Sequence, residues 1–336
     1  MSKKTTALIY CLALALGALW LGGKQQIIGG PMIGLLMSML LVNALNMEEE
    51  FKKQALAVGK KLLDFGIILA GGTLHFSQIL GFGSKALGLL LLNLVLAFLV
   101  ASYFGRRLGL SDNTAKLVGG GTAICGGTAI ATLATIFKAK EEEIAYALTA
   151  IFLFDVLAAL GYPYLAKALG MSANQFGFLA GSAINDTSSV AAAQETFNVL
   201  MGIEATQPIT VKMTRIMLLI PTSLFFAFRQ LGSGEKDQDG LLKTVQRIFP
   251  WAILWFMLMA LFNSLGFFSF IGIPGKVFSL SYKYFITAAL VGIGLKIRFK
   301  DLLTQGAKPI LLGGITWLSL ALSSLIFIFV FRNFIG

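Results

Sequence analysis

Long apolar segments separated by short polar stretches run along almost the whole chain. Each is close to the roughly 20 residues that a helix needs to cross the hydrocarbon core of a bilayer. Eleven segments can be distinguished, at residues 7–23, 27–46, 62–80, 85–105, 115–137, 142–166, 175–200, 209–229, 248–271, 282–300 and 308–331. The longest polar stretch, Arg229–Arg247, is expected to be an exposed loop. The pattern predicts an all-α polytopic membrane protein with about 11 transmembrane segments and a single membrane domain.

Composition and charge support this prediction. Of the 336 residues, 57% are hydrophobic and 13% are charged, whereas soluble domains carry about 25% charged residues. Soluble enzymes and nucleic-acid-binding proteins are therefore excluded. If all eleven segments cross and the N-terminus is cytoplasmic, the cytoplasmic loops hold 18 of the 27 Lys and Arg residues. This bias predicts a multi-pass protein of the bacterial cytoplasmic (inner) membrane, and it explains the net charge of +11 without an acidic partner.

Two weak internal repeats occur along the chain. Gly71–Leu89 aligns without gaps with Gly294–Leu312, and Gly121–Ala131 (GTAICGGTAIA) aligns with Gly181–Ala191 (GSAINDTSSVA). Internal repeats of inverted topology are typical of secondary transporters. We expect residues 1–26 to form an additional N-terminal helix, residues 27–170 a first repeat unit and residues 171–336 a second. The two alignments have different offsets, so both can hold only if the order of the segments in the second unit is permuted.

The segments 115–137 and 175–200 are rich in Gly, Ser and Thr, and we expect two discontinuous helices there, broken or re-entrant. A half-helix that begins inside the membrane presents free N–H groups and a positive dipole, which suit an anion. The substrate-binding candidates are Gly121, Thr122, Cys125, Gly126, Gly127, Thr128, Asn185, Thr187 and Ser188. The alternative is helix packing, since small residues are common where transmembrane helices touch. Whether the two segments cross fully or re-enter stays open.

Two acidic residues lie inside apolar segments, where a carboxylate is costly and marks a functional site by default. Asp186 can coordinate a cation, carry a coupling proton or cap the half-helix that starts at Thr187. Asp155 is the second candidate for ion coupling, and its alternative role is a hydrogen bond between helices. The chain has two cysteines and one histidine, so no metal site and no cofactor is expected. Without a catalytic constellation, we expect no enzyme.

The paired motifs resemble those of the UPF0324 membrane proteins, also known as conserved hypothetical protein 698 and described as sulfate exporters. The first motif falls on residues 121–127, the second on 184–188 and Val190, and Ala289–Leu303 (ALVGIGLKIRFKDLL) fits as well. The resemblance implies inverted repeats, discontinuous helices that cross near the midplane, and a mobile core beside a panel domain. Family members commonly have His where this chain has Asn185, which puts proton coupling or substrate choice at that position in doubt.

These observations predict a secondary active transporter of a small anion. Sulfate, sulfite or an organosulfonate is favoured, with H⁺ or Na⁺ as the coupling ion and the site between the two broken segments. A passive anion channel and a transporter of small carboxylates are the alternatives. The expected partners are the anionic substrate, the coupling ion and the lipid bilayer, with no nucleic acid. The sequence leaves the direction of transport and the oligomeric state open, a homodimer being one possible state.

Overall fold

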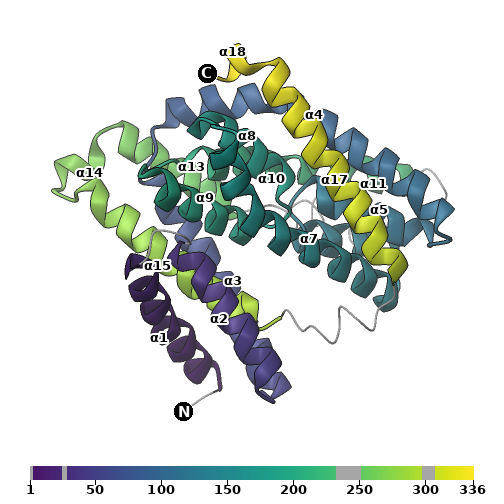
Figure 1. The fold of residues 1–336 in the computed structure, drawn as a ribbon, viewed down its shortest axis with the longest axis horizontal. Helices are drawn as coiled ribbons and strands as arrows, with labels where there is room; N and C mark the ends of the chain where they lie inside the picture. Colours follow the sequence, from purple (N-terminus) through teal and green to yellow (C-terminus); the bar gives the residue numbers. More distant parts are fainter. Residues whose placement is uncertain (1–2, 25–28, 232–250, 297–306) are drawn as a thin grey trace.

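The structure is a computed structural model that describes residues 3–24, 29–231, 251–296 and 307–336, and all regular structure within them is helical (Figure 1). The helices are α1 (Lys3–Lys24), α2 (Gly30–Ala44), α3 (Glu49–Gly71), α4 (Phe76–Arg107), α5 (Asp112–Ala123), α6 (Gly127–Phe137), α7 (Glu141–Ala168), α8 (Ala173–Ala183), α9 (Thr187–Met201), α10 (Gln207–Met217), α11 (Leu219–Leu231), α13 (Trp251–Ser264), α14 (Phe267–Phe270), α15 (Gly275–Gly294), α17 (Ala307–Val330) and α18 (Arg332–Ile335).

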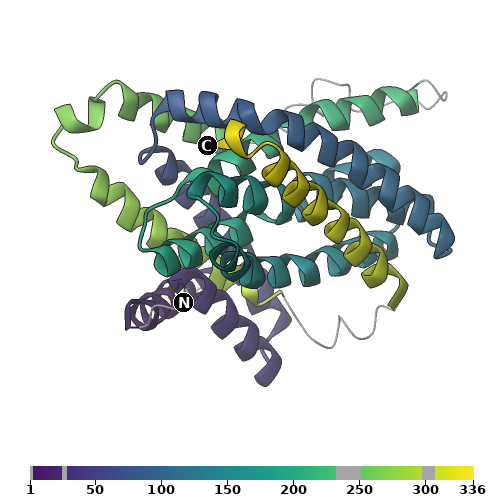
Figure 2. The same ribbon diagram turned by 45° about the horizontal axis from the view of Figure 1, so that its top comes forward.

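Contacts between helices divide most of them into two groups that lie side by side (Figure 1). The four-helix group consists of α1, α2, α3 and α15, which pack on one another. The hairpin group consists of α4 to α11 with α17, which lies along α4 and α7 (Figure 2). Helix α9 contacts both α2 and α15, so it lies where the two groups meet.

Several helices begin where the sequence supplies a capping side chain. The Ser111 hydroxyl accepts a hydrogen bond from the Thr114 backbone N–H at 3.1 Å and caps α5. Ser172 and Gln175 bond each other's backbone N–H at the start of α8. A serine followed three residues later by glutamine satisfies two N–H groups that the first turn leaves free. These caps fix where the two Gly, Ser and Thr-rich segments start.

Close contact between α3 and α15 depends on glycine. A Cβ atom at Gly292 would lie 2.5 Å from the Ala55 carbonyl oxygen and 2.9 Å from the Gly59 Cα. Both neighbours are backbone atoms, which cannot move aside as a side chain can. The four-helix group therefore packs backbone against backbone at this crossing, as helices in membranes often do.

The expected segments correspond to helices in most places. Six parts of the described chain are long and apolar enough to cross a membrane, namely α1, Leu80–Arg107 within α4, α7, Gln207–Arg229, α15 and α17. Four expected segments each contain two helices: 115–137, 175–200, 209–229 and 248–271. Most of the expected loop at Arg229–Arg247, and part of the repeat at Gly294–Leu312, lie outside the described residues. The fold is that of a polytopic membrane protein.

The expected segment 62–80 is wrong. Helix α3 begins at Glu49 and ends at Gly71, and α4 begins at Phe76 after a turn. The first half of α3 reads EEFKKQALAVGKK, so its hydropathy is low although it is helical. Contacts with α15, among them the Gly59 contact described above, hold this polar half in the helix.

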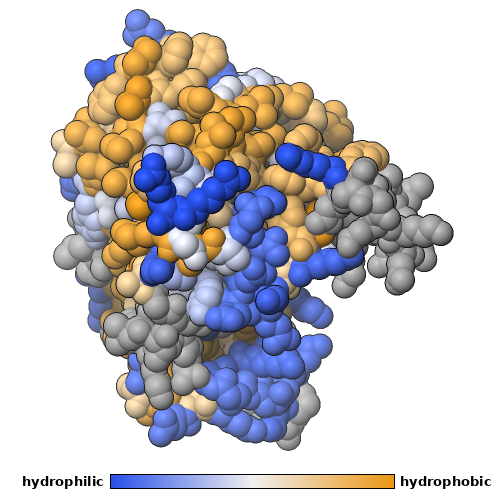
Figure 3. Space-filling view, turned by 90° about the vertical axis from the view of Figure 1, so that its right-hand side faces the viewer, coloured by the Kyte–Doolittle hydropathy of each residue, from blue (hydrophilic) through white to orange (hydrophobic). Residues whose placement is uncertain are grey.

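Large hydrophobic side chains are exposed along the outer helices. Leu91, Val95 and Leu99 on α4 and Leu322 and Ile326 on α17 are each at least half exposed. The face in Figure 3 shows broad hydrophobic areas beside an area of hydrophilic residues. A soluble monomer rarely exposes so much contiguous apolar surface, and a lipid bilayer is the solvent that such helix faces require.

Candidate functional site

Helices α5 and α6 form an antiparallel hairpin. Its tip is residues 124–126, where Gly126 adopts a φ of +68°, a conformation that only glycine reaches without strain. A Cβ on Gly120, late in α5, would meet the Leu133 side chain, late in α6. Because the two helices run back along each other, the chain turns at the tip and returns towards its starting side.

Helices α8 and α9 form a second hairpin, whose tip is residues 184–186. The rings of Phe176 near the start of α8 and Phe197 near the end of α9 stack with centroids 4.0 Å apart. Helix α10 then runs back along α9, and the Gln194 side chain accepts a hydrogen bond from the Ile209 backbone N–H at 3.2 Å. Like the first hairpin, the second consists of two helices that run antiparallel and are joined at a short tip.

The two hairpins start at opposite ends of α7. The Ser111 hydroxyl at the base of the first hairpin donates a hydrogen bond of 2.5 Å to Glu143 in the first turn of α7. Helix α7 then runs for 28 residues, and the second hairpin begins soon after its end. The tips meet beside the middle of α7, where a Cβ on Gly126 would lie 3.6 Å from the Asn185 carbonyl group.

Two buried cations on α10, Lys212 and Arg215, hold the tips together. The Lys212 ammonium and the Arg215 guanidinium are fully buried and donate hydrogen bonds to backbone carbonyls of both hairpins. The acceptors are Ile124, Ile184 and Asn185 for Lys212, and Thr122, Ala123, Gly181 and Ile184 for Arg215. Because α5 and α8 both end here, the two positive charges lie where two helix dipoles are negative. They also satisfy carbonyls that no helix pairs.

Two carboxylates lie at the start of α9. Asp186 caps the helix, accepting hydrogen bonds from the Ser188 backbone N–H at 2.9 Å and from the Ser188 hydroxyl. Asp155, near the middle of α7, accepts from the Asp186 backbone N–H at 2.7 Å and from the Ser189 hydroxyl. Asp186 thus has the capping role, and Asp155 forms the hydrogen bond between helices. The sequence had left both roles open. Protein carboxylates therefore occupy the positive end of α9.

A cavity lies beside these carboxylates, between the two helix groups. Its lining comes from α2, α7, α9, α15 and the residues just after α15, and consists of Leu35, Phe152, Asp155, Val156, Asp186, Ser188, Ser189, Ile293 and Lys296. The Lys296 ammonium lies 4.0 Å from the centroid of the Phe152 ring. Among the described residues it forms no ion pair with a carboxylate. The cavity thus combines one cation, two carboxylates and a largely aliphatic and aromatic wall.

The structure brings most of the predicted site residues to one place. Asp155, Asp186 and Ser188 line the cavity. The others gather at or next to the tips, and of these Gly121, Thr122, Cys125, Gly126, Asn185 and Thr187 are buried while Gly127 is partly buried. Thr128 instead lies on the exposed face of α6. The Thr122 hydroxyl and the Asn185 amide oxygen have no hydrogen-bond partner within the described structure.

Sequence reasoning missed Lys212 and Arg215. They lie three residues apart in the expected segment 209–229, which otherwise looks like an ordinary transmembrane helix. A cation inside such a segment was the available signal, because intramembrane charges mark functional positions as strongly as intramembrane acids do. Lys296, near the end of the expected segment 282–300, can attract an anion or simply flank the segment as far as the sequence shows, and in the structure it lines the cavity.

Comparison with known proteins identifies the family. The sequence model of conserved hypothetical protein 698 matches residues 6–313. A UPF0324 membrane protein of Streptococcus pneumoniae (strain ATCC BAA-255 / R6) is 36% identical over 330 residues, which cover 97% of this chain and 96% of the relative. This chain belongs to the UPF0324 family of membrane proteins. UPF0324 proteins of Streptococcus pyogenes serotype M18 and Streptococcus agalactiae serotype V are 36% and 32% identical, each over 96% of both chains. The resemblance to this family, predicted from the sequence, is confirmed.

The role of Lys212 can be tested by Lys212→Met, which keeps the volume of the side chain and removes its donors. We expect a clear fall in the midpoint of thermal unfolding in detergent, because each buried carbonyl that loses its partner costs about 1–3 kcal/mol. Lys167→Met, at an exposed position on α7, is the matched control and should unfold near the wild-type temperature. Equal midpoints for the two variants would contradict the structural role assigned to Lys212.

Proposed function

We propose that this UPF0324 protein is a secondary active transporter of a small anion and that the cavity beside the hairpin tips is its substrate site. Sulfate, sulfite and organosulfonates are the first candidates, and small carboxylates are the alternative. The observation that carries the proposal is the charge balance of the buried site. The charges of Lys212 and Arg215 offset those of Asp155 and Asp186, and Lys296, with Lys60 nearby, leaves the cavity positively charged.

The hairpins support a site inside the membrane. Non-helical backbone at membrane depth is tolerated only where it is buried in protein or lines a cavity. The tips at 124–126 and 184–186 meet beside the middle of a 28-residue helix. We propose that both hairpins are re-entrant and enter from opposite sides of the membrane. The units 27–170 and 171–336 would then each contribute one hairpin, as inverted repeats do.

The boundary between the helix groups supports transport by a relative movement. The cavity is lined by α7 and α9 from the hairpin group and by α2 and α15 from the four-helix group. A site between two bodies can be exposed first to one side and then to the other when one body moves against the other. We propose this movement for the transport cycle, with the hairpin group as the mobile part.

Asp155 supports coupling to a cation. Its carboxylate accepts hydrogen bonds from the Asp186 backbone N–H and the Ser189 hydroxyl, as an anion bound at the start of α9 would do. A proton on Asp155 weakens both bonds and releases donors for the substrate. Na⁺ is the alternative coupling ion, because carboxylate and hydroxyl oxygens are ligands that a hard cation prefers.

The charge of Lys296 gives the first test. Purified protein in proteoliposomes should take up the transported anion against its gradient when a pH or Na⁺ gradient is imposed. Lys296→Gln should weaken apparent anion affinity by at least about tenfold, since hydrogen bonds to a charged group are worth about 1.5–3 kcal/mol. Lys276→Gln, at an exposed position near the start of α15, is the control. Equal affinities in the two variants would argue against an anion at this cavity, and purely downhill flux would indicate a channel.

Asp155→Asn gives the second test. The amide can still accept from the Asp186 N–H, but it cannot bind or release a proton. We expect gradient-driven accumulation to be lost while downhill exchange of the substrate continues. Asp112→Asn, at an exposed position paired with Lys116, should behave as the wild type. Undiminished accumulation by the Asp155 variant would remove this residue from the coupling mechanism, and dependence on Na⁺ alone would select Na⁺ as the coupling ion.

A further inference from the structure

Helices α5 and α8 both end at the hairpin tips, among buried residues. Their last residues, Ala123 and Ala183, are at most 1% exposed. The carbonyl end of a helix carries a negative dipole and oxygens that the helix itself does not pair. In secondary transporters, such half-helix ends and the non-helical carbonyls beside them coordinate the coupling Na⁺. The two tips together therefore have the chemistry of a cation site.

A lysine of the protein occupies this cation site. The Lys212 ammonium has three N–H donors, and it donates to three tip carbonyls, those of Ile124, Ile184 and Asn185. These oxygens come from both hairpins, as the ligands of a metal ion between the tips would. Arg215 donates to further carbonyls of the same two hairpins. Both cations are thus fixed to the chain and used up by the backbone.

The carboxylates at the start of α9 are a second place with ligands for a cation. Asp155 and Asp186 each already accept two hydrogen bonds from the protein. Lys212 acts on Asp155 from α10, and Lys296, itself close to Lys60, lies in the wall of the same cavity. A metal ion that entered the cavity would be repelled by these lysines, and burial leaves that repulsion poorly screened.

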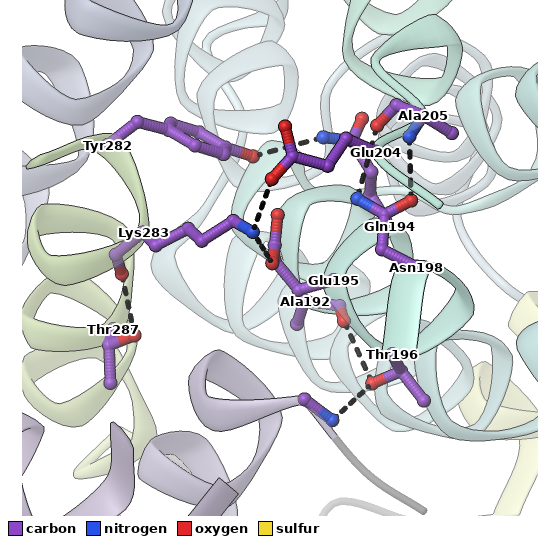
Figure 4. Close-up of polar contacts among 11 residues, drawn as sticks. Ala192, Gln194, Glu195, Thr196, Asn198, Glu204, Ala205, Tyr282, Lys283 and Thr287 are labelled. Atoms are coloured by element: carbon purple, nitrogen blue, oxygen red, sulfur yellow. Dashed lines mark hydrogen bonds and ion pairs between the residues drawn. The ribbon is translucent and has the colours of Figure 1, made fainter. Parts of the chain in front are cut away.

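A third place with acidic ligands lies between the two helix groups (Figure 4). Glu195 of α9 is, with Asp155, one of the two buried acids of the described chain. The Lys283 ammonium on α15 lies 3.4 Å from a Glu195 oxygen and 3.7 Å from an oxygen of the exposed Glu204. Here too a lysine lies between two carboxylates, where a metal ion would otherwise bind.

The amide side chains of this cluster are used within the protein as well (Figure 4). The Asn198 amide oxygen accepts a hydrogen bond from the Ala205 backbone N–H at 2.9 Å. The Gln194 amide oxygen accepts from the Ile209 backbone N–H, as described above. The oxygens that a metal ion would need beside the carboxylates therefore already have donors.

Resting on the proposed function, we infer that the coupling ion is a proton, and that Lys212 and Arg215 are fixed cations in the place where a Na⁺-coupled carrier would bind Na⁺. A fixed cation neutralises the helix ends in every state of the cycle, so no ion has to bind or leave at the tips. The proton binds the Asp155 carboxylate from water on one side of the membrane and leaves it to water on the other.

The surroundings of Asp155 account for the coupling. The charged and titratable groups of the described chain that act on it or share its cavity are Tyr162 of α7, Asp186 before α9, Lys212 and Arg215 of α10, and Lys296 after α15. An anion bound in the cavity adds negative charge beside Asp155 and so favours binding of a proton there. The same anion is favoured when Asp155 is neutral, which makes the linkage reciprocal.

The wild-type protein gives the first measurement. Thermal unfolding of the purified protein in detergent is followed in the chlorides of Na⁺, Li⁺, K⁺ and choline at equal ionic strength. A cation that binds only the folded state raises the midpoint, and we expect equal midpoints in the four salts. Uptake of sulfate or methanesulfonate driven by a pH gradient should be unchanged when choline replaces Na⁺. A rise in the midpoint specific to Na⁺, or accumulation that requires Na⁺, overturns the inference.

Removal of the fixed cation gives the second measurement. Lys212→Ala leaves the three carbonyls and opens a space in which a free cation can bind. We expect its unfolding midpoint to be several degrees higher in the chloride of Na⁺, Li⁺ or methylammonium than in choline chloride. Lys167→Ala, at an exposed position on α7, is the matched control and should have the same midpoint in every salt. A midpoint of Lys212→Ala that does not depend on the salt contradicts the fixed-cation role, and if this variant does not fold, the wild-type comparison decides alone.

The outcomes distinguish this inference from the function on which it rests. Accumulation of sulfate or methanesulfonate that follows a Na⁺ gradient overturns proton coupling and leaves the anion transporter standing. If neither gradient drives accumulation of any anion, the transporter is contradicted. The effect of salt on the stability of Lys212→Ala does not depend on transport, so it still decides whether Lys212 holds the place of a free cation.

Discussion

The arrangement of the candidate site depends on hydrogen bonds from two buried cations to the carbonyl ends of two helices. Lys212 and Arg215 lie one turn apart on α10 and reach the tips of both hairpins at once. Without them, the ends of α5 and α8 would place two negative dipoles and several unpaired carbonyls together in a buried region. A helix end of this kind is stable in lipid only when other groups satisfy it. The same contacts therefore join the hairpins and allow both tips to end in the buried interior of the protein.

The charges of the site form one connected set. The two cations of α10 donate to backbone carbonyls, and buried Asp155 and partly buried Asp186 lie at the start of α9 as their counter-charges. Their hydrogen bonds already use the donors that the sequence suggested for a substrate. An anion that enters the cavity therefore competes with a carboxylate of the protein itself. In the proposed function, this competition links the protonation of Asp155 to the binding of substrate.

The local sequence was enough to predict where these helices end. It could not predict the contacts between segments that lie far apart in the chain. The Gly126–Gly127 pair and the Asp186-Thr187-Ser188 sequence lie where the chain leaves and re-enters the helical conformation. Mid-segment Asp155 was recognisable because a carboxylate is rare in an apolar run. The proximity of Lys296 to Asp155, and of Lys212 to Ile124, has no local pattern, because each pair lies far apart in the chain. Helix α3 was misplaced because packing keeps its polar first half helical.

The position of Asp155 near the middle of α7 has an electrical consequence. A helix of 28 residues is about 42 Å long at 1.5 Å per residue, so a charge beside its centre lies well inside the region across which the membrane voltage falls. Moving one elementary charge through that voltage changes the free energy by about 2.3 kcal/mol per 100 mV. A monovalent anion that moves together with one proton carries no net charge, so the voltage does no work on that step. In the proposed cycle with proton coupling, the concentration gradients of the anion and the proton would then set the direction of transport.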